Sequence, residues 1–151
     1  MSRYIALILA AAAVIDQAAS LGINCRGSNL CGRASTKNAV KHITGYINGE
    51  ISADRTYNNG EHIACITDGN SISTKGGFCA FLQNTKNGAT GVEIEELALV
   101  LADRKDDVCG NCGSVPYTAL KRLGNKNDPK DGILTFNFVS NTDNPCPTGL
   151  C

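Results

Sequence analysis

Two stretches of the chain repeat apolar residues at spacings of three and four, which is the period of one face of an α-helix. The first runs from about Thr36 to Tyr46, with Ser35 or Thr36 as its N-cap, and it ends near Gly45 and Gly49. Its apolar stripe consists of Ala39, Val40, Ile43 and Ile47. This pattern predicts an amphipathic helix that buries one side.

The second helical stretch runs from about Val92 to Arg104. Thr90 and Glu93 have the spacing of a capping box, in which each side chain bonds the backbone N–H of the other residue. The inward positions are Ile94, Leu97, Ala98 and Leu101. We therefore predict a second helix that starts just after Thr90.

Four other stretches have the composition or the alternation of β-strands. They are Leu21–Cys25, Glu61–Thr67, Phe78–Leu82 and Ile133–Val139. In the last of these, Leu134, Phe136 and Phe138 share the face that we expect against the helices, while Thr135 and Asn137 lie on the other. Strands with two interposed helices predict an α+β fold.

The first twenty residues have the features of a secretory signal peptide. Arg3 precedes an apolar run from Ile5 to Ile15, and small residues lead to Ser20. The run is too short for a membrane-spanning helix, which needs about twenty apolar residues. We expect residues 1–20 to be removed and residues 21–151 to form one secreted, extracellular domain that does not span a membrane.

The charge balance limits the kinds of partner. The chain has 14 basic and 14 acidic residues, so it has no net positive charge with which to hold nucleic acid. Apolar residues make up 42% of the chain, but it has no Trp and only 5% aromatic residues. We expect one aliphatic core, a monomer and no nucleic-acid partner.

All eight cysteines lie after Ser20, and in a secreted chain an even number predicts four disulfides. Cys109 and Cys112 also have the spacing of half a zinc site or of a redox motif. A second such pair is missing, and His42 and His62 are distant in sequence. We therefore expect structural bridges, with no metal and no cofactor, and spacing alone does not choose the connectivity.

Several blocks of the sequence together resemble the KP4 killer toxins, small secreted proteins of fungi and of a fungal virus. The blocks are Leu21–Ser28 with Cys31–Gly32, Gly69–Ser73, Cys109–Ser114 and Leu134–Val139. They occur in the family's order with compatible spacing over the whole of residues 21–151. The resemblance is therefore more specific than any single block.

The resemblance implies an α/β sandwich, in which one antiparallel sheet of about five strands is covered on one face by two antiparallel helices and stapled by disulfides. By the same analogy, Cys25 bridges to Cys109 and Cys31 to Cys112. Cys65 and Cys79 are then left to pair with Cys146 and Cys151. We favour Cys65–Cys146 with Cys79–Cys151, and the swapped pairing stays open.

For function, the resemblance implies a toxin or effector, not an enzyme, that inhibits competing fungi and in some members affects plant cells. For the viral toxin this is attributed to interference with calcium uptake through channels, so a target-cell surface protein such as a calcium channel is the expected partner. That toxin is strongly basic and has a lysine just before the cysteine matching Cys65. Here His62 is the nearest cation. Candidate target-binding residues are Arg26, Arg33, Lys37, Lys41, His62 and Lys75.

Two other classes of function compete with a toxin. One is a non-toxic secreted interaction or inhibitor protein. The other is a small secreted ribonuclease, in which His42 or His62 would work with Glu50 or Glu61 as general acid and base. No motif supports catalysis, and the Gly-x-Ser-x-Gly nucleophile elbow does not occur. We therefore expect no enzymatic activity.

Overall fold

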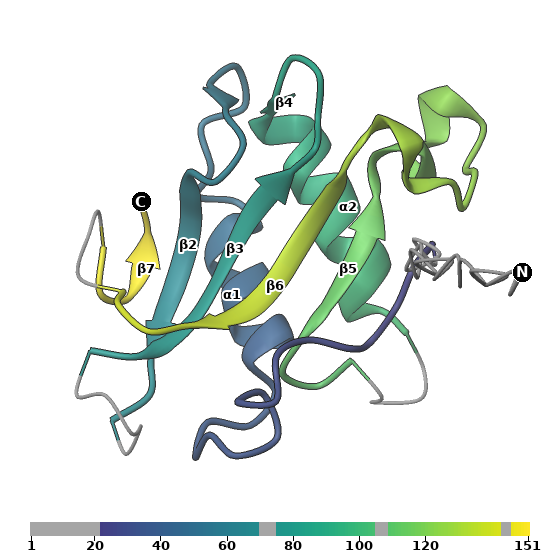
Figure 1. Ribbon diagram of the computed structural model, residues 1–151. Helices are drawn as coiled ribbons and strands as arrows, with labels where there is room; N and C mark the ends of the chain where they lie inside the picture. Colours follow the sequence, from purple (N-terminus) through teal and green to yellow (C-terminus); the bar gives the residue numbers. More distant parts are fainter. Residues whose placement is uncertain (1–21, 70–74, 105–108, 143–145) are drawn as a thin grey trace, which may run out of the picture.

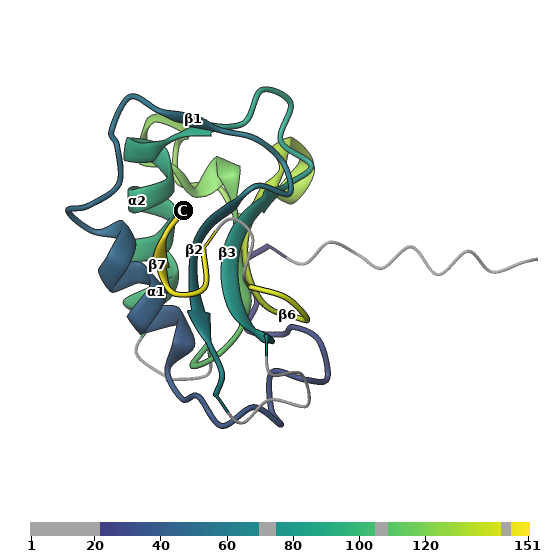
Figure 2. The same cartoon turned by 90° about the vertical axis from the view of Figure 1, so that its left-hand side faces the viewer.

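The computed structural model describes residues 22–69, 75–104, 109–142 and 146–151. Its centre is a five-stranded antiparallel sheet in the order β5-β6-β3-β2-β7. The strands are β2 (His62–Thr67), β3 (Gly77–Gln83), β5 (Gly113–Pro116), β6 (Ile133–Val139) and β7 (Gly149–Leu150). Helices α1 (Ala39–Ile47) and α2 (Gly91–Ala102) cover one face of it, as Figures 1 and 2 show. The expected α+β sandwich is confirmed.

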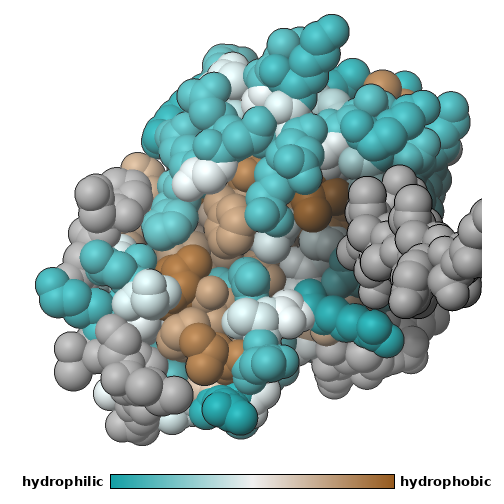
Figure 3. All heavy atoms as spheres, in the orientation of Figure 1, coloured by the Kyte–Doolittle hydropathy of each residue, from teal (hydrophilic) through white to brown (hydrophobic). Residues whose placement is uncertain are grey.

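The core lies between the helices and the covered face of the sheet. Phe78, Leu82, Leu134 and Phe136 point into it from the central strands β3 and β6 and are fully buried. On the open face a smaller cluster surrounds Cys65, Cys79 and Cys146, with Phe81 and Val139 packed against it. Figure 3 shows this face, where hydrophobic side chains gather over the middle of the sheet and hydrophilic ones surround them. The alternation along β6 therefore gave the correct inward face.

The two helices differ in how well the sequence predicted their starts. The capping box of Thr90 and Glu93 is present, and α2 begins at Gly91. In contrast, α1 begins three residues late, after Asn38, whose φ of 56° lies in the left-handed region. The predicted caps Ser35 and Thr36 are wrong, because their backbone N–H groups bind a side chain from elsewhere in the fold.

The strand predictions hold in the middle of the sheet and fail at its edges. The strand predicted over 133–139 is confirmed without change. The strand predicted over 21–25 is wrong, because its described part makes only an isolated bridge between Asn24 and Ser114. Sequence reasoning also missed the short edge strands β5 and β7, and the two-stranded sheet of β1 (Thr56–Tyr57) and β4 (Ala89–Thr90).

Four disulfides cross-link the fold. Two of them are the long-range bridges that the resemblance implied, Cys25–Cys109 and Cys31–Cys112. The favoured pairing of the other four cysteines and its swapped form are both wrong, because the structure joins Cys65 to Cys79 and Cys146 to Cys151. Cys65 and Cys79 lie directly opposite each other in the register of β2 and β3, so the nearest sulfur is across the strand pair.

The proposed signal peptide, residues 1–20, lies outside the described residues. In the part of the chain that the structure describes, no helix has the length and apolar composition needed to cross a membrane.

Candidate target-binding surface

The segment before α1 contains almost no regular structure, yet it is held firmly to the segment after α2. Two disulfides join these segments, and the side chain of Asn111 adds a hydrogen bond of 3.0 Å from its Nδ2 to the carbonyl oxygen of Cys31. The backbone N–H of Val40 donates to the carbonyl oxygen of Gly110 at 3.1 Å. These links fix the N-terminal loop beside the start of α1 and the end of α2.

Asp68 fastens the same loop to the end of β2. It is 1% exposed, and its carboxylate accepts from the backbone N–H of Ser35 at 3.1 Å and from that of Thr36 at 3.0 Å. The hydroxyl of Thr36 donates to it at 2.9 Å. The residues that Asp68 binds are more than thirty positions away, so local sequence patterns do not predict these contacts.

The structure brings most of the predicted target-binding cations to one end of the molecule. Arg26 and Arg33 lie in the N-terminal loop, and Lys37 and Lys41 lie just before and inside α1. Lys75 precedes β3, beside the hydrogen bond from the Asp68 N–H to the Gly76 carbonyl oxygen. All of these loops and ends meet in the lower part of Figure 1.

Arg104 joins this group, although it was not among the target-binding residues predicted from the sequence, where it only marked the end of the second helix. Arg104 and Lys41 line one small hollow between α1 and α2, with Cys109 at its edge. We use the name basic end for the exposed cations Arg26, Arg33, Lys37, Lys41, Lys75 and Arg104. The antiparallel packing of the helices creates it, because the start of α1 and the end of α2 lie together.

His62, the remaining predicted target-binding residue, does not lie at the basic end. It sits at the start of β2 on the open face, where its Nδ1 is 3.7 Å from the sulfur of Cys79 and its ring centroid is 6.2 Å from that of Phe81. Its nitrogen and the sulfurs of Cys65 and Cys79 lie within 4.8 Å of one another, the spacing of a metal site. Both sulfurs are in a disulfide, so neither provides the thiolate that a metal ion requires.

Glu61, one of the carboxylates considered for a ribonuclease, already has two partners. The Glu61 carboxylate binds the Arg55 guanidinium and, at 2.9 Å, the backbone N–H of Asn58. His42 lies near the start of α1, whereas Glu50 lies beyond its other end, which is Ile47.

A second polar cluster lies at the opposite end, where α2 begins. The Glu93 carboxylate accepts from the Thr90 N–H at 2.8 Å and pairs with Arg122, whose guanidinium donates to the Tyr117 hydroxyl at 2.7 Å. Partial burial acts to raise the pKa of Glu93, but the hydrogen bonds from Thr90, Tyr117 and Arg122 outweigh it and lower that pKa. Burial and the hydrogen bond to Glu93 raise the pKa of Tyr117.

These features define a small α+β protein, stapled by four disulfides, that presents a cross-linked cationic end; such cross-linking is typical of proteins that fold in an oxidising compartment. A profile of the Kp4 family matches residues 8–140. The chain is 36% identical over 133 residues to the KP4 killer toxin of Ustilago maydis P4 virus, covering 87% of this chain and 91% of that toxin. The chain therefore belongs to the Kp4 family.

Proposed function

We propose that this protein is a secreted toxin that inhibits the growth of competing fungi and of some plant cells, and that the basic end binds a protein on the target-cell surface. Residues 1–20 direct secretion, and the domain over 21–151 acts outside the cell without catalysis. Membership of the Kp4 family supports the toxin class. The gathering of exposed cations on a cross-linked scaffold is the observation that supports the binding surface.

A calcium channel is the target that fits this surface best. Calcium pathways are lined by carboxylates, and an end rich in Lys and Arg is electrostatically complementary to them. The whole chain is neutral, but its attraction to such a target depends on local charge. The nearby Asp68 carboxylate is turned inward and engaged by backbone N–H groups. Asp103, beside Arg104, is exposed, but the six cations of the basic end outnumber it.

The experiment is a growth-inhibition assay with purified, oxidised protein on fungi and on plant roots, with and without excess calcium. We expect the double variant Lys41→Gln/Arg104→Gln to lose about tenfold in potency. It removes two cations, each of which would form an ion pair with the target worth up to about 1 kcal/mol. Excess calcium should relieve inhibition by the wild type.

The matched control is Lys126→Gln/Lys130→Gln, which removes the same charge from exposed sites elsewhere. It should keep full potency. Equal loss in both variants would show that net charge, and not the basic end, sets potency. Inhibition that calcium does not relieve would point to a target other than a calcium channel, and a protein that inhibits neither fungi nor roots would be a non-toxic interaction protein.

A further inference from the structure

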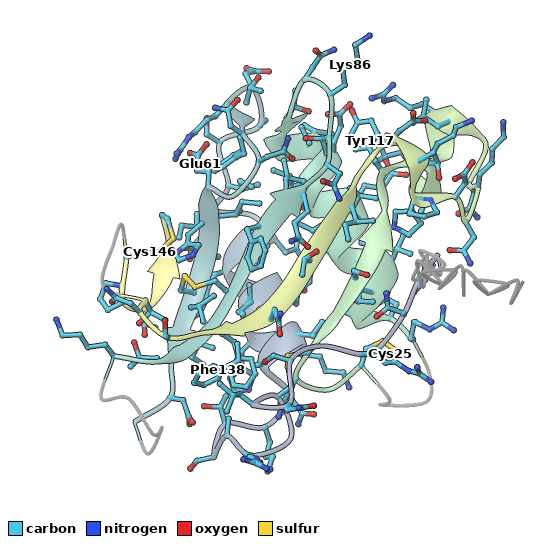
Figure 4. The ribbon with its side chains drawn as sticks, in the orientation of Figure 1. Cys25, Glu61, Lys86, Tyr117, Phe138 and Cys146 are labelled. Carbon is cyan, nitrogen blue, oxygen red and sulfur yellow. A yellow bond between two sulfur atoms is a disulfide. The ribbon has the colours of Figure 1, made fainter. Side chains whose placement is uncertain are left out.

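A cavity of about 250 Å³ lies at the opposite end from the basic end, between two segments distant in sequence. One wall is the loop from β3 to β4, with Thr85, Lys86, Asn87 and Gly88. The other wall comes from the turns between β5 and β6, with Tyr117, Leu123 and Asp131. Figure 4 shows Lys86 at the tip of the first wall and Tyr117 on the second.

The first wall is held in place by a dedicated side chain. Asn59 donates from Nδ2 to the carbonyl oxygen of Thr85 at 2.7 Å and accepts from its N–H at 3.0 Å and its hydroxyl at 2.8 Å. Gly132 packs so closely on Thr85 that a Cβ there would approach its backbone nitrogen to 2.6 Å. The loop and the facing turn are therefore fixed relative to each other, and the cavity is formed before any ligand arrives.

The second wall presents an aromatic ring in a fixed orientation. The hydroxyl of Tyr117 is held by Arg122, and the Arg122 guanidinium lies 5.6 Å from the ring centroid. Arg122 is anchored in turn by Glu93. A ring that is held in this way offers a flat apolar surface at low entropic cost, and Leu123 extends that surface.

The polar groups around the cavity combine hydrogen-bond donors and acceptors with no excess of either charge. Lys86 and Asp131 lie on opposite walls, and neither takes part in an ion pair recorded among the described residues. Asn87 supplies both a donor and an acceptor. A ligand with a net charge would face one like charge, so the lining suits a molecule without net charge. Tyr117 and Leu123 add an apolar surface, which matches the C–H face of a sugar ring better than a small zwitterion.

We propose that this cavity binds a single neutral sugar ring, such as a terminal residue of a cell-surface glycan. The apolar C–H face of the ring would stack on Tyr117, and its hydroxyls would donate to Asp131 and accept from Lys86. The volume lies below the roughly 300–1,000 Å³ of pockets for drug-sized ligands, so it suits one ring, with the rest of a glycan in solvent. The site is distinct from the basic end and stands apart from the channel proposal.

The test is NMR titration of the oxidised, isotope-labelled protein with glucose, mannose, galactose, xylose and N-acetylglucosamine. At least one sugar should produce saturable shifts in the amide signals of Lys86, Asn87 and Leu123, with a Kd on the order of 1 mM. Asp131→Asn should weaken that binding about tenfold, and Asn87→Ala should weaken it as well. Asp54→Asn, which removes an exposed carboxylate outside the cavity, should leave the Kd unchanged.

Absence of saturable shifts from every sugar up to about 50 mM would overturn the proposal, because single-ring ligands of Kd near 1 mM would be saturated there. Glycine and acetate serve as charged probes in the same titration. If glycine or acetate produces saturable shifts at these amides and no sugar does, the proposal is also overturned, because the cavity would then bind a zwitterion or an anion. Dispersed spectra of Asp131→Asn and Asn87→Ala verify that both variants are folded.

Discussion

The two ends of this molecule hold their loops in place by different means. At the basic end, two long-range disulfides and one buried carboxylate fix a segment without helix or strand. At the opposite end, where α2 begins, the fastening is entirely noncovalent: the capping box, the Glu93–Arg122 pair and the bonds from Asn59 to Thr85. Two of the four cross-links therefore lie where backbone hydrogen bonding is least regular.

This difference follows from what each segment lacks. The N-terminal loop donates few backbone hydrogen bonds to a sheet or helix, and its exposed residues are charged, polar or glycine, so burial stabilises it little. A disulfide acts mainly on the unfolded chain and does not require burial of the loop that it closes. The basic end can therefore expose many cations and still keep a defined shape. The opposite end depends on polar contacts that respond to pH.

The largest effect should come from removing the disulfides of the basic end. Cys25–Cys109 spans 84 residues, whereas Cys146–Cys151 spans 5. The chain-entropy model gives the two bridges about 4.5 and about 2 kcal/mol. Cys31–Cys112 closes almost the same loop, so breaking Cys25–Cys109 alone recovers only part of this entropy. The variant in which Cys25, Cys109, Cys31 and Cys112 are all replaced by Ser should therefore melt at least about 10 °C below Cys146→Ser/Cys151→Ser in a calorimetric scan.

Each variant removes both cysteines of every bridge that it breaks, so no free thiol is left to exchange with the remaining bridges. A lower Tm for Cys146→Ser/Cys151→Ser would contradict the idea that the long bridge matters more. It would show that the C-terminal cluster around Cys65, and not the N-terminal loop, is the weak point of the fold.

The next effect concerns the buried carboxylate of the basic end. Asp68→Ala leaves the backbone N–H groups of Ser35 and Thr36 without their acceptor, and hydrogen bonds to a charged group contribute about 1.5–3 kcal/mol. We expect a loss of about 2–3 kcal/mol in denaturant unfolding, with a smaller loss for Asp68→Asn, which keeps one acceptor oxygen. Asp103→Ala, at an exposed carboxylate nearby, should change stability by less than about 0.5 kcal/mol.

The sequence predicted what depends on local patterns and missed what depends on distant partners. The capping box at Thr90 and the alternation along β6 involve residues that are close in sequence, so both could be predicted from the sequence. The start of α1 was not, because Asp68 takes the backbone N–H groups of the residues that looked like N-caps. Edge strand β5 is four residues long and ends in Pro116, which is too short to show a clear alternation.

The same distinction between local patterns and distant partners applies to the candidate target-binding surface. Composition and the resemblance supplied the cations of the basic end, but only antiparallel helix packing brings Arg104 next to Lys41. His62 is the first residue of β2. The sequence does not show in which direction β2 runs relative to the helices, so it did not predict that His62 lies away from the basic end. Cys65 and Cys79 were assigned to distant partners because the sequence did not reveal that they are opposite in register.

A smaller, pH-dependent effect should mark the opposite end. Glu93→Gln removes the charge that pairs with Arg122 and weakens the capping box, so we expect a loss of about 1 kcal/mol at pH 7. Glu95→Gln, in the same helical turn, should have little effect. Thermal midpoints of both variants and the wild type measure the difference.

The pH dependence has a definite sign. Because folding lowers the pKa of Glu93, its contribution is complete above the unfolded value near 4.3 and is lost as the pH falls through the lower folded value. The gap between the wild type and Glu93→Gln should therefore narrow as the pH falls below about 4.3. A gap that stays constant down to pH 2 would mean that the glutamate acts only through its shape.

The smallest expected effect is on proteolytic cleavage after Lys121–Arg122, a dibasic pair that a Kex2-like protease of the secretory pathway would recognise. Here the pair lies in a 3-10 turn, the Lys121 N–H donates to the Glu96 carboxylate at 2.7 Å, and Arg122 is held by Glu93 and Tyr117. A protease needs an extended segment with a free arginine, so both contacts must open before cleavage. We expect a single band after reduction of the secreted protein, and faster cleavage of Glu93→Gln than of Glu95→Gln by added protease. Equal rates for these two variants would show that the Glu93–Arg122 pair does not protect the site.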